Sequence, residues 1–247
     1  MSVDNPTHRL RRPACGRWCA WWAGLLIWCA TLAAAPATVH TTGPALMRSV
    51  AEQALDDPRA ALSGVRQRLA SLSAGDAGTA FWLRLALVDV LVHTDQEVES
   101  RRELAAAAQA LPASAAGPQE RLWLEHFQRY VDTGTVDPEA FRRQQAAVRE
   151  RARAAGDAHL LCRLDLNEAA LLVEQDAVDE AWAALEAVDR CAAELGDAGL
   201  RAYALGTMGP LAWRVGSLQP PQTYYQRALA ALGERPARYK RAWLLDD

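Results

Sequence analysis

Glycine residues divide most of this chain into units of nearly equal length, and no other feature constrains the fold as strongly. The tripeptide Gly-Asp-Ala occurs three times, beginning at Gly75, Gly156 and Gly196, and the last two copies are 40 residues apart. Gly117 and Gly233 occupy the intervening and the following positions of the same period. Each glycine follows an alanine-rich stretch, where a left-handed backbone conformation is needed to end a helix. The spacing predicts a helical repeat of about 40 residues.

Near the middle of each unit, turn residues interrupt the helical pattern a second time, and residues typical of helix starts follow them. In the second unit, Asp137 supplies an N-cap and Pro138 a first helical residue. Each unit is therefore predicted to be two helices joined by a short turn. The expected helices span 77–93, 97–111, 118–131, 138–154, 157–174, 178–194, 197–214 and 220–232, after a shorter pair at 44–55 and 58–72.

The periodicity and the composition both indicate an all-α fold. No segment alternates apolar and polar residues over the length of a strand, and alanine, roughly a fifth of the chain, favours helices. A single helix pair cannot cover its own apolar stripe, so neighbouring pairs must stack. We predict a right-handed α-solenoid of about five antiparallel helix pairs, with a curved concave face and no single deep cavity. Its predicted parts are an N-terminal pair at 38–74, repeats at 75–116, 117–155, 156–195 and 196–233, and the start of a truncated further helix at 234–247.

The first 37 residues have the features of an export signal. Four arginines precede an uncharged segment at 18–35, and Ala35-Pro36-Ala37 fits the pattern that signal peptidase cleaves. We predict cleavage after Ala37 and a periplasmic or secreted protein. The alternative is an uncleaved anchor in the inner membrane, because the apolar segment is only slightly shorter than the roughly 20 residues that span a bilayer.

Two cysteines, Cys162 and Cys191, lie in the predicted mature chain, which is an even number in an oxidising compartment. Both lie at about the same distance from the predicted turn near Asp176, so they share one level of an antiparallel helix pair. A disulfide between them would close a loop of about 30 residues and contribute roughly 3 kcal/mol. The equally weighted alternative is that both are small core residues.

The sequence carries no motif of a known catalytic or cofactor site. It contains no Gly-x-Ser-x-Gly, no His-Glu-x-x-His, no phosphate loop and no dinucleotide fingerprint. His93, His126 and His159 are evenly spaced, but they fall at different positions of their units and are not expected to converge on a metal. A net charge of -3 does not favour nucleic acid. We predict a protein that is not an enzyme and uses no cofactor or metal.

The last repeat resembles a tetratricopeptide repeat. Gly209, Gly216, Tyr225 and Ala228 lie at the spacings of that family's helix glycine, turn glycine, aromatic residue and alanine. The resemblance covers residues 77–232, although the period is about 40 instead of 34 residues. It implies a TPR-like array, with other helical-hairpin solenoids as the alternative.

The resemblance also implies that the first helix of each unit lines the concave surface and contacts a partner there. The residues that would do so are Trp82, Asp89, Arg163, Tyr203 and Trp213. Tryptophan, tyrosine and arginine are enriched at binding hot spots. For the aromatic residues, the alternative is a place in the core.

These expectations favour an exported, non-enzymatic scaffold that binds a protein or peptide and contacts a membrane only through an uncleaved N-terminal segment. The alternative is a sensor, since the chain is similar in style to the periplasmic input regions of bacterial diguanylate cyclases and histidine kinases, without an output domain. A third hypothesis, a helical-repeat enzyme such as a lytic transglycosylase, requires a catalytic glutamate in a globular domain that the sequence does not reveal.

Overall fold

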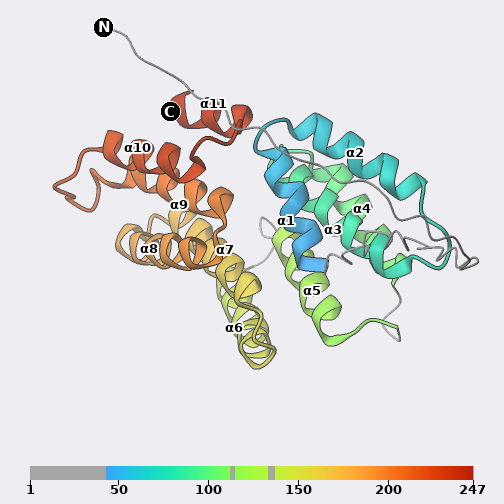
Figure 1. The fold of residues 1–247 in the computed structure, drawn as a ribbon. Coiled ribbons are helices and arrows are strands. Elements are labelled where there is room, and N and C mark those ends of the chain that lie inside the picture. The colour runs from blue at the N-terminus through green and yellow to red at the C-terminus, as the bar shows by residue number, and fades with distance from the viewer. Residues whose placement is uncertain (1–42, 112–114, 133–136, 247) are drawn as a thin grey trace, which may run out of the picture. The chain divides into compact units, whose positions relative to one another are not determined.

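The computed structural model describes residues 43–111, 115–132 and 137–246, which belong to one compact unit, His40–Asp247 (Figure 1). The predicted leader at 1–37, with its cleavage site, lies outside these residues. Eleven helices and no strand occur in the described ranges, so the all-α class is confirmed. The helices are α1 (Gly43–Ala54), α2 (Pro58–Ala70), α3 (Ala77–Val92), α4 (Glu97–Ala110), α5 (Pro118–Asp132), α6 (Pro138–Ala154), α7 (Ala158–Glu174), α8 (Val178–Leu195), α9 (Ala198–Leu211), α10 (Pro221–Leu232) and α11 (Arg238–Asp246).

Aspartate caps explain why four of these helices begin where the sequence predicts. Asp57, Asp137, Asp157 and Asp197 precede α2, α6, α7 and α9. Each carboxylate accepts a hydrogen bond from the backbone N–H three residues later, at 2.8 to 3.0 Å. Such a cap typically contributes about 1 kcal/mol, because it satisfies a backbone donor that the helix leaves free. The predicted helices agree with the observed ones to within three residues at every end.

Glycine ends helices at three of the five predicted positions. Gly156, Gly196 and Gly233 follow α6, α8 and α10 and have left-handed φ values of 66°, 67° and 60°. The prediction was wrong for Gly75 and Gly117, which do not have a positive φ. The physical reason is that α2 and α4 end several residues earlier, so these two glycines lie in the connections to the next helices.

The helices pack around two hydrophobic clusters. The first includes the fully buried rings of Phe81, Trp123 and Phe127, and the second includes Leu185 and Leu205. Helix α7 contributes residues to both clusters, so it joins the two halves of the core. The main interfaces between neighbours in sequence are those of α3 with α4, α7 with α8, α8 with α9 and α9 with α10. In addition, α3 contacts both α1 and α5, and α5 contacts α7.

The last helix, α11, contacts the turn between α1 and α2 (Figure 1). The backbone N–H groups of Tyr239 and Lys240 donate to the carbonyl oxygens of Asp56 and Leu55 at 3.2 and 3.0 Å. The guanidinium of Arg238 pairs with the Asp56 carboxylate at 2.9 and 3.1 Å. The predicted start of a further helix is therefore a short helix that bonds to the N-terminal pair. None of the helices in the described part of the chain is long and apolar enough to span a membrane.

A disulfide joins α7 to α8. The sulfur atoms of Cys162 and Cys191 lie 2.07 Å apart and the Cα atoms 5.9 Å apart. Of the two alternatives that the sequence left open, a disulfide or two free core cysteines, the structure has the disulfide. Cys162 is buried in the second hydrophobic cluster, and Cys191 packs against that cluster. The bond therefore fixes one helix pair at its core.

We expect the double substitution Cys162→Ala/Cys191→Ala to lower the free energy of unfolding by about 3 kcal/mol, because the bond closes a loop between residues 29 apart in sequence. Urea titration of the variant and the natural protein measures the difference. Natural protein that has been refolded in excess reductant should lose about the same amount, whereas the variant should be insensitive to reductant. Equal stability of the natural protein with and without reductant would contradict the expectation.

Candidate functional site

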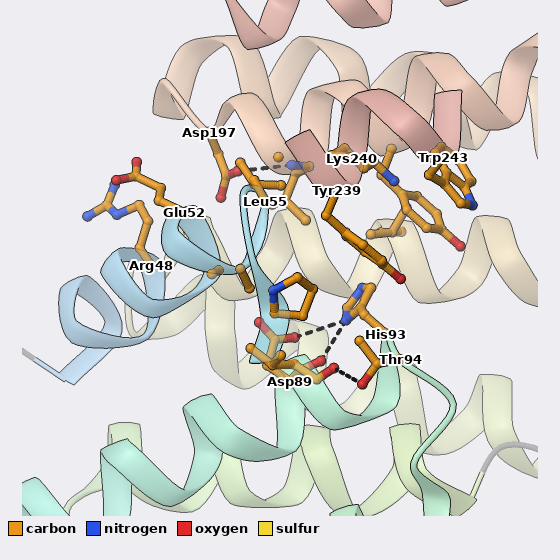
Figure 2. A pocket seen from close by; sticks show the side chains of 18 of the residues that line it. Arg48, Glu52, Leu55, Asp89, His93, Thr94, Asp197, Tyr239, Lys240 and Trp243 are labelled. Atoms are coloured by element: carbon orange, nitrogen blue, oxygen red, sulfur yellow. Dashed lines mark hydrogen bonds and ion pairs between the residues drawn. The ribbon is translucent and has the colours of Figure 1, made fainter. Parts of the chain in front are cut away.

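A cavity of ≈ 150 Å³ lies among α1, α3, α7, α9, α11 and the first residue of α2 (Figure 2). The sequence analysis expected a concave face without a single deep cavity; in the structure, residues of α1 and α11 form part of the wall of this small cavity. Apolar residues make up much of the wall, including Ala51, Ala54, Leu55, Pro58, Val90, Leu166 and Leu200. The polar residues of the wall come from segments far apart in the chain, so only the folded protein assembles this site.

A buried ion pair forms one side of the cavity. Both Nη atoms of Arg163 on α7 donate to the carboxylate oxygens of Asp89 on α3, at 2.6 and 2.7 Å. Only 3% of Asp89 and 6% of Arg163 are exposed. Burial alone would raise the pKa of Asp89, but the charge and hydrogen bonds of Arg163 lower it to about 2. The carboxylate therefore stays ionised at neutral pH.

Arg163 and His93 both form hydrogen bonds with Asp89. Nε of Arg163 is buried and has no acceptor among the described residues. Nδ1 of His93 lies 2.7 Å from the carbonyl oxygen of Asp89. Because a carbonyl oxygen only accepts, Nδ1 must be the donor of this hydrogen bond. Asp89 thus holds both side chains in place at the wall.

An aromatic corner joins α9 and α11 in the wall of the cavity. The rings of Tyr203 and Trp243 are stacked with centroids 5.8 Å apart, and His93 meets Tyr203 edge-on at 6.1 Å. The ammonium of Lys240 lies 4.6 Å from the Tyr203 centroid and 3.4 Å from that of Trp243. Contacts of this kind contribute about 0.5 to 2 kcal/mol, depending on how far the cation is removed from water.

The structure brings three of the five predicted binding residues together. Asp89, Arg163 and Tyr203 all line the cavity, although the first two also satisfy each other. His93, Lys240 and Trp243 complete the polar and aromatic wall and were not predicted. Lys240 is the only lysine of the chain, which is the one signal in the sequence that could have drawn attention to α11.

The other two predicted residues lie elsewhere. Trp82 is 6% exposed and packs edge-on against Phe81 and Trp123 in the first hydrophobic cluster. The structure thus places Trp82 in the core, which was the alternative for the aromatic residues. Trp213 is 74% exposed, follows the end of α9 and does not line the cavity.

A second hollow of ≈ 880 Å³ lies over α2, the turn after α3 and the start of α11. It is more open than the cavity, and two of its arginines already form surface ion pairs, Arg66 with Glu99 and Arg238 with Asp56. Exposed ion pairs contribute little energy and give little selectivity. The smaller cavity is therefore the stronger candidate for a specific site.

Comparisons with known proteins point to no relative. No protein-family model, no curated protein and no solved structure matches this chain. In the part of the chain that the structure describes, no group of three or more histidine, cysteine, aspartate or glutamate side chains could hold a metal ion.

Proposed function

We propose that this protein is a non-enzymatic binding module and that a small ligand occupies the cavity. The observation that carries the proposal is the convergence of residues from six helices on one mostly apolar space that has a buried arginine–aspartate pair in its wall. Apolar cavities with a few convergent polar groups are the usual form of small-molecule sites. A cavity of about 150 Å³ admits a molecule of the size of benzene.

We infer a TPR-like α-solenoid of about five helix pairs, right-handed as the resemblance implies. The contacts of α3 with α1 and α5, and of α5 with α7, support it, because the first helices of successive units touch in such a stack. In this arrangement α1 and α11 extend over part of the concave face.

Binding without catalysis agrees with the state of the polar groups. Asp89 is a poor general base because Arg163 engages both of its oxygens and holds its pKa near 2. The Nδ1 atom of His93 is engaged by the carbonyl oxygen of Asp89, and Lys240 lies against two rings. These groups shape the cavity and can orient a ligand in it, which is what a binding site requires.

Export is the second part of the proposal. A disulfide such as Cys162–Cys191 persists in oxidising compartments, which favours a periplasmic or secreted protein. Cleavage after Ala37, and its alternative of an inner-membrane anchor, remain proposals that N-terminal sequencing of the exported protein would decide.

A protein or peptide partner along the concave face has less support. Asp89 and Arg163, two of the residues expected to contact it, neutralise each other, and Trp82 is buried. The sensor hypothesis has a specific observation in its favour. Because Tyr239, Lys240 and Trp243 belong to the cavity wall, a bound ligand would act directly on α11. A sensor needs such coupling between ligand and a structural element.

Filling the cavity tests the proposal. Ala51 lines the cavity, whereas Ala105 is exposed on α4, so Ala51→Phe and Ala105→Phe are matched variants of the full-length protein. We expect compounds of up to about eight non-hydrogen atoms to include binders that, at about 100 times their Kd, stabilise the natural protein by about 2.7 kcal/mol. The same compounds should stabilise Ala105→Phe equally and Ala51→Phe hardly at all.

The measurement is a thermal-shift screen, with circular dichroism to verify that both variants are folded. A screen without any stabilising compound would contradict the proposal. So would compounds that stabilise both variants to the same extent, because they would bind outside the cavity.

A further inference from the structure

We propose that α11 is a lid that swings away from the cavity on the connection 233–237, and that the cavity opens to solvent when it does so. The inference rests on the proposed function and names the conformational step that controls access to that site. Three features of the structure support it: the part of the wall that α11 supplies, the way in which α11 is attached, and the backbone of the connection before it.

Helix α11 supplies part of the cavity wall from the same face that packs on the protein. Tyr239, Lys240 and Trp243 line the cavity (Figure 2). Lys240 and Leu244 are 9% and 2% exposed, and Trp243 stacks on Tyr203. Residues three and four apart lie on one face of a helix, so α11 covers the cavity and packs against α9 with a single face. If the helix left, the cavity would lose this part of its wall.

Exposed polar contacts hold the start of α11. The backbone N–H groups of Arg238, Tyr239 and Lys240 all donate to Asp56 or Leu55 in the turn between α1 and α2. These are donors that the first turn of a helix leaves free, so water can satisfy them when the helix departs. The Arg238 side chain, which pairs with the Asp56 carboxylate, is 77% exposed. An ion pair in water contributes little, so this end is released at small cost.

The packing of α11 on α9 depends on one glycine. A Cβ atom at Gly206 would lie 2.7 Å from the indole of Trp243 and 2.8 Å from the side chain of Leu244. Among the described helices, only α10 forms a sizeable backbone interface with α11, so α11 is attached to α9 mainly through side chains. Because these side chains share one face, their contacts with α9 are made or lost together when the helix moves as a unit.

The connection between α10 and α11 has the backbone of a hinge. Gly233 ends α10 with a φ of 60°, and Ala237 has a φ of 36° directly before α11. This conformation is costly for alanine and persists only where surrounding contacts impose it. The docked position of α11 fixes Ala237, so release of the helix relieves this strain and offsets part of the lost contacts. Hinges absorb a change of backbone angles at a few such residues.

Two substitutions in the full-length protein are expected to raise the population of the open lid. Gly206→Ala places a Cβ atom against Trp243, and Asp56→Ala removes the carboxylate that pairs with Arg238. Amide hydrogen exchange in α11 should become at least about fivefold faster in Gly206→Ala and about two- to fivefold faster in Asp56→Ala. The N–H group of Lys240 reports docking directly, because its acceptor lies in the α1–α2 turn. Exchange in α7 should stay unchanged.

Matched controls exclude a general effect of these substitutions. Gly64→Ala makes the same change inside α2, where a Cβ atom would meet no neighbour within 4 Å. Glu99→Ala breaks another exposed ion pair, that with Arg66. Neither should alter exchange in α11. Circular dichroism verifies that all variants are folded.

A thiol in the wall measures whether the cavity opens with the lid. Val90 lines the cavity and is 4% exposed, so Val90→Cys places a thiol there. The rate of its alkylation by iodoacetamide, read at that residue by mass spectrometry, should rise by the same factor as exchange in α11 when Gly206→Ala is added. Val88→Cys, on the same helix, is the control: Val88 is fully buried, does not line the cavity and should not become more reactive.

Three outcomes would overturn the lid. Exchange in α11 that neither substitution accelerates, or that rises only together with exchange in α7, would show that the helix leaves only when the whole protein unfolds. Faster exchange without faster alkylation of the Val90→Cys thiol would show that the cavity stays closed. Fast alkylation in every variant would show that it is already open with α11 docked. None of these measurements uses a ligand, so the proposed function fails separately, on the screen of small compounds.

Discussion

Replacing Asp89 with alanine is expected to lower the free energy of unfolding by about 3 to 5 kcal/mol, because Arg163 would be left as an uncompensated charge in the interior. Both side chains are buried, and each oxygen of the carboxylate accepts one hydrogen bond from the guanidinium. The pair also joins α3 to α7 across 74 residues of sequence. Urea titration at neutral pH measures the loss.

Two comparisons give this result its meaning. The double variant Asp89→Leu/Arg163→Met replaces the pair by apolar side chains and should recover most of the stability, since removal of both charges also removes their desolvation cost. Glu139→Ala breaks the exposed pair with Arg143 and should cost no more than about 0.5 kcal/mol. A loss below about 1 kcal/mol for Asp89→Ala would contradict the view that the pair is buried and isolated from water.

The helices could be predicted from the sequence because their signals are local. Asp137 caps α6 and Pro138 occupies its first turn, where both residue types are preferred, and Gly196 ends α8 because it adopts a left-handed conformation at no steric cost. The same locality explains the errors at Gly75 and Gly117. A glycine in a connection has the same appearance in sequence as one that ends a helix.

The cavity could not be predicted because it depends on contacts between distant segments. Asp89 and Arg163 were both expected on the concave face, but nothing in the sequence indicated that they bind each other instead of a partner. The contribution of Lys240 and Trp243 depends on hydrogen bonds between α11 and the turn after α1, which are long-range contacts of the backbone. Repeat periodicity describes neighbours in a stack and gives no information about contacts between its two ends.

These long-range contacts link the candidate site to the packing of α11 against the rest of the protein. Helix α11 binds the α1–α2 turn through Arg238 and Asp56, and it lines the cavity through Lys240 and Trp243. The side chains of Trp243 and Leu244 pack so closely on α9 that a Cβ atom at Gly206 would lie 2.7 Å from the indole. A ligand that contacts and displaces Trp243 would therefore also displace α9 or α11, because their interface has little free space.

Acidification is expected to destabilise the protein by about 3 kcal/mol between pH 7 and pH 4 through His126 alone. Only 2% of His126 is exposed, and its ring is stacked on Tyr130 at 6.2 Å and lies against Phe127 at 5.0 Å. Burial lowers the pKa of His126 to about 3, and the charge of Arg163 acts in the same direction. The carboxylate of Asp89 acts against it.

The sign follows from proton uptake. As pH falls through about 6.5 the unfolded chain binds a proton on His126, whereas the folded protein does so only near pH 3. The unfolded state therefore holds more protons throughout this window, and stability falls by about 1.4 kcal/mol per pH unit. Asp89 does not reverse the trend, because its pKa of about 2 keeps the ion pair with Arg163 charged down to pH 4.

Substitution isolates this contribution from that of every other titrating group. His126→Phe removes the proton site and keeps an aromatic ring in the core, so the difference in unfolding free energy between variant and natural protein should change by about 3 kcal/mol from pH 7 to pH 4. Exposed carboxylates titrate alike in both proteins and cancel in the difference. Urea titrations at four pH values are sufficient, and parallel pH profiles for the two proteins would show that His126 is accessible to protons in the folded state.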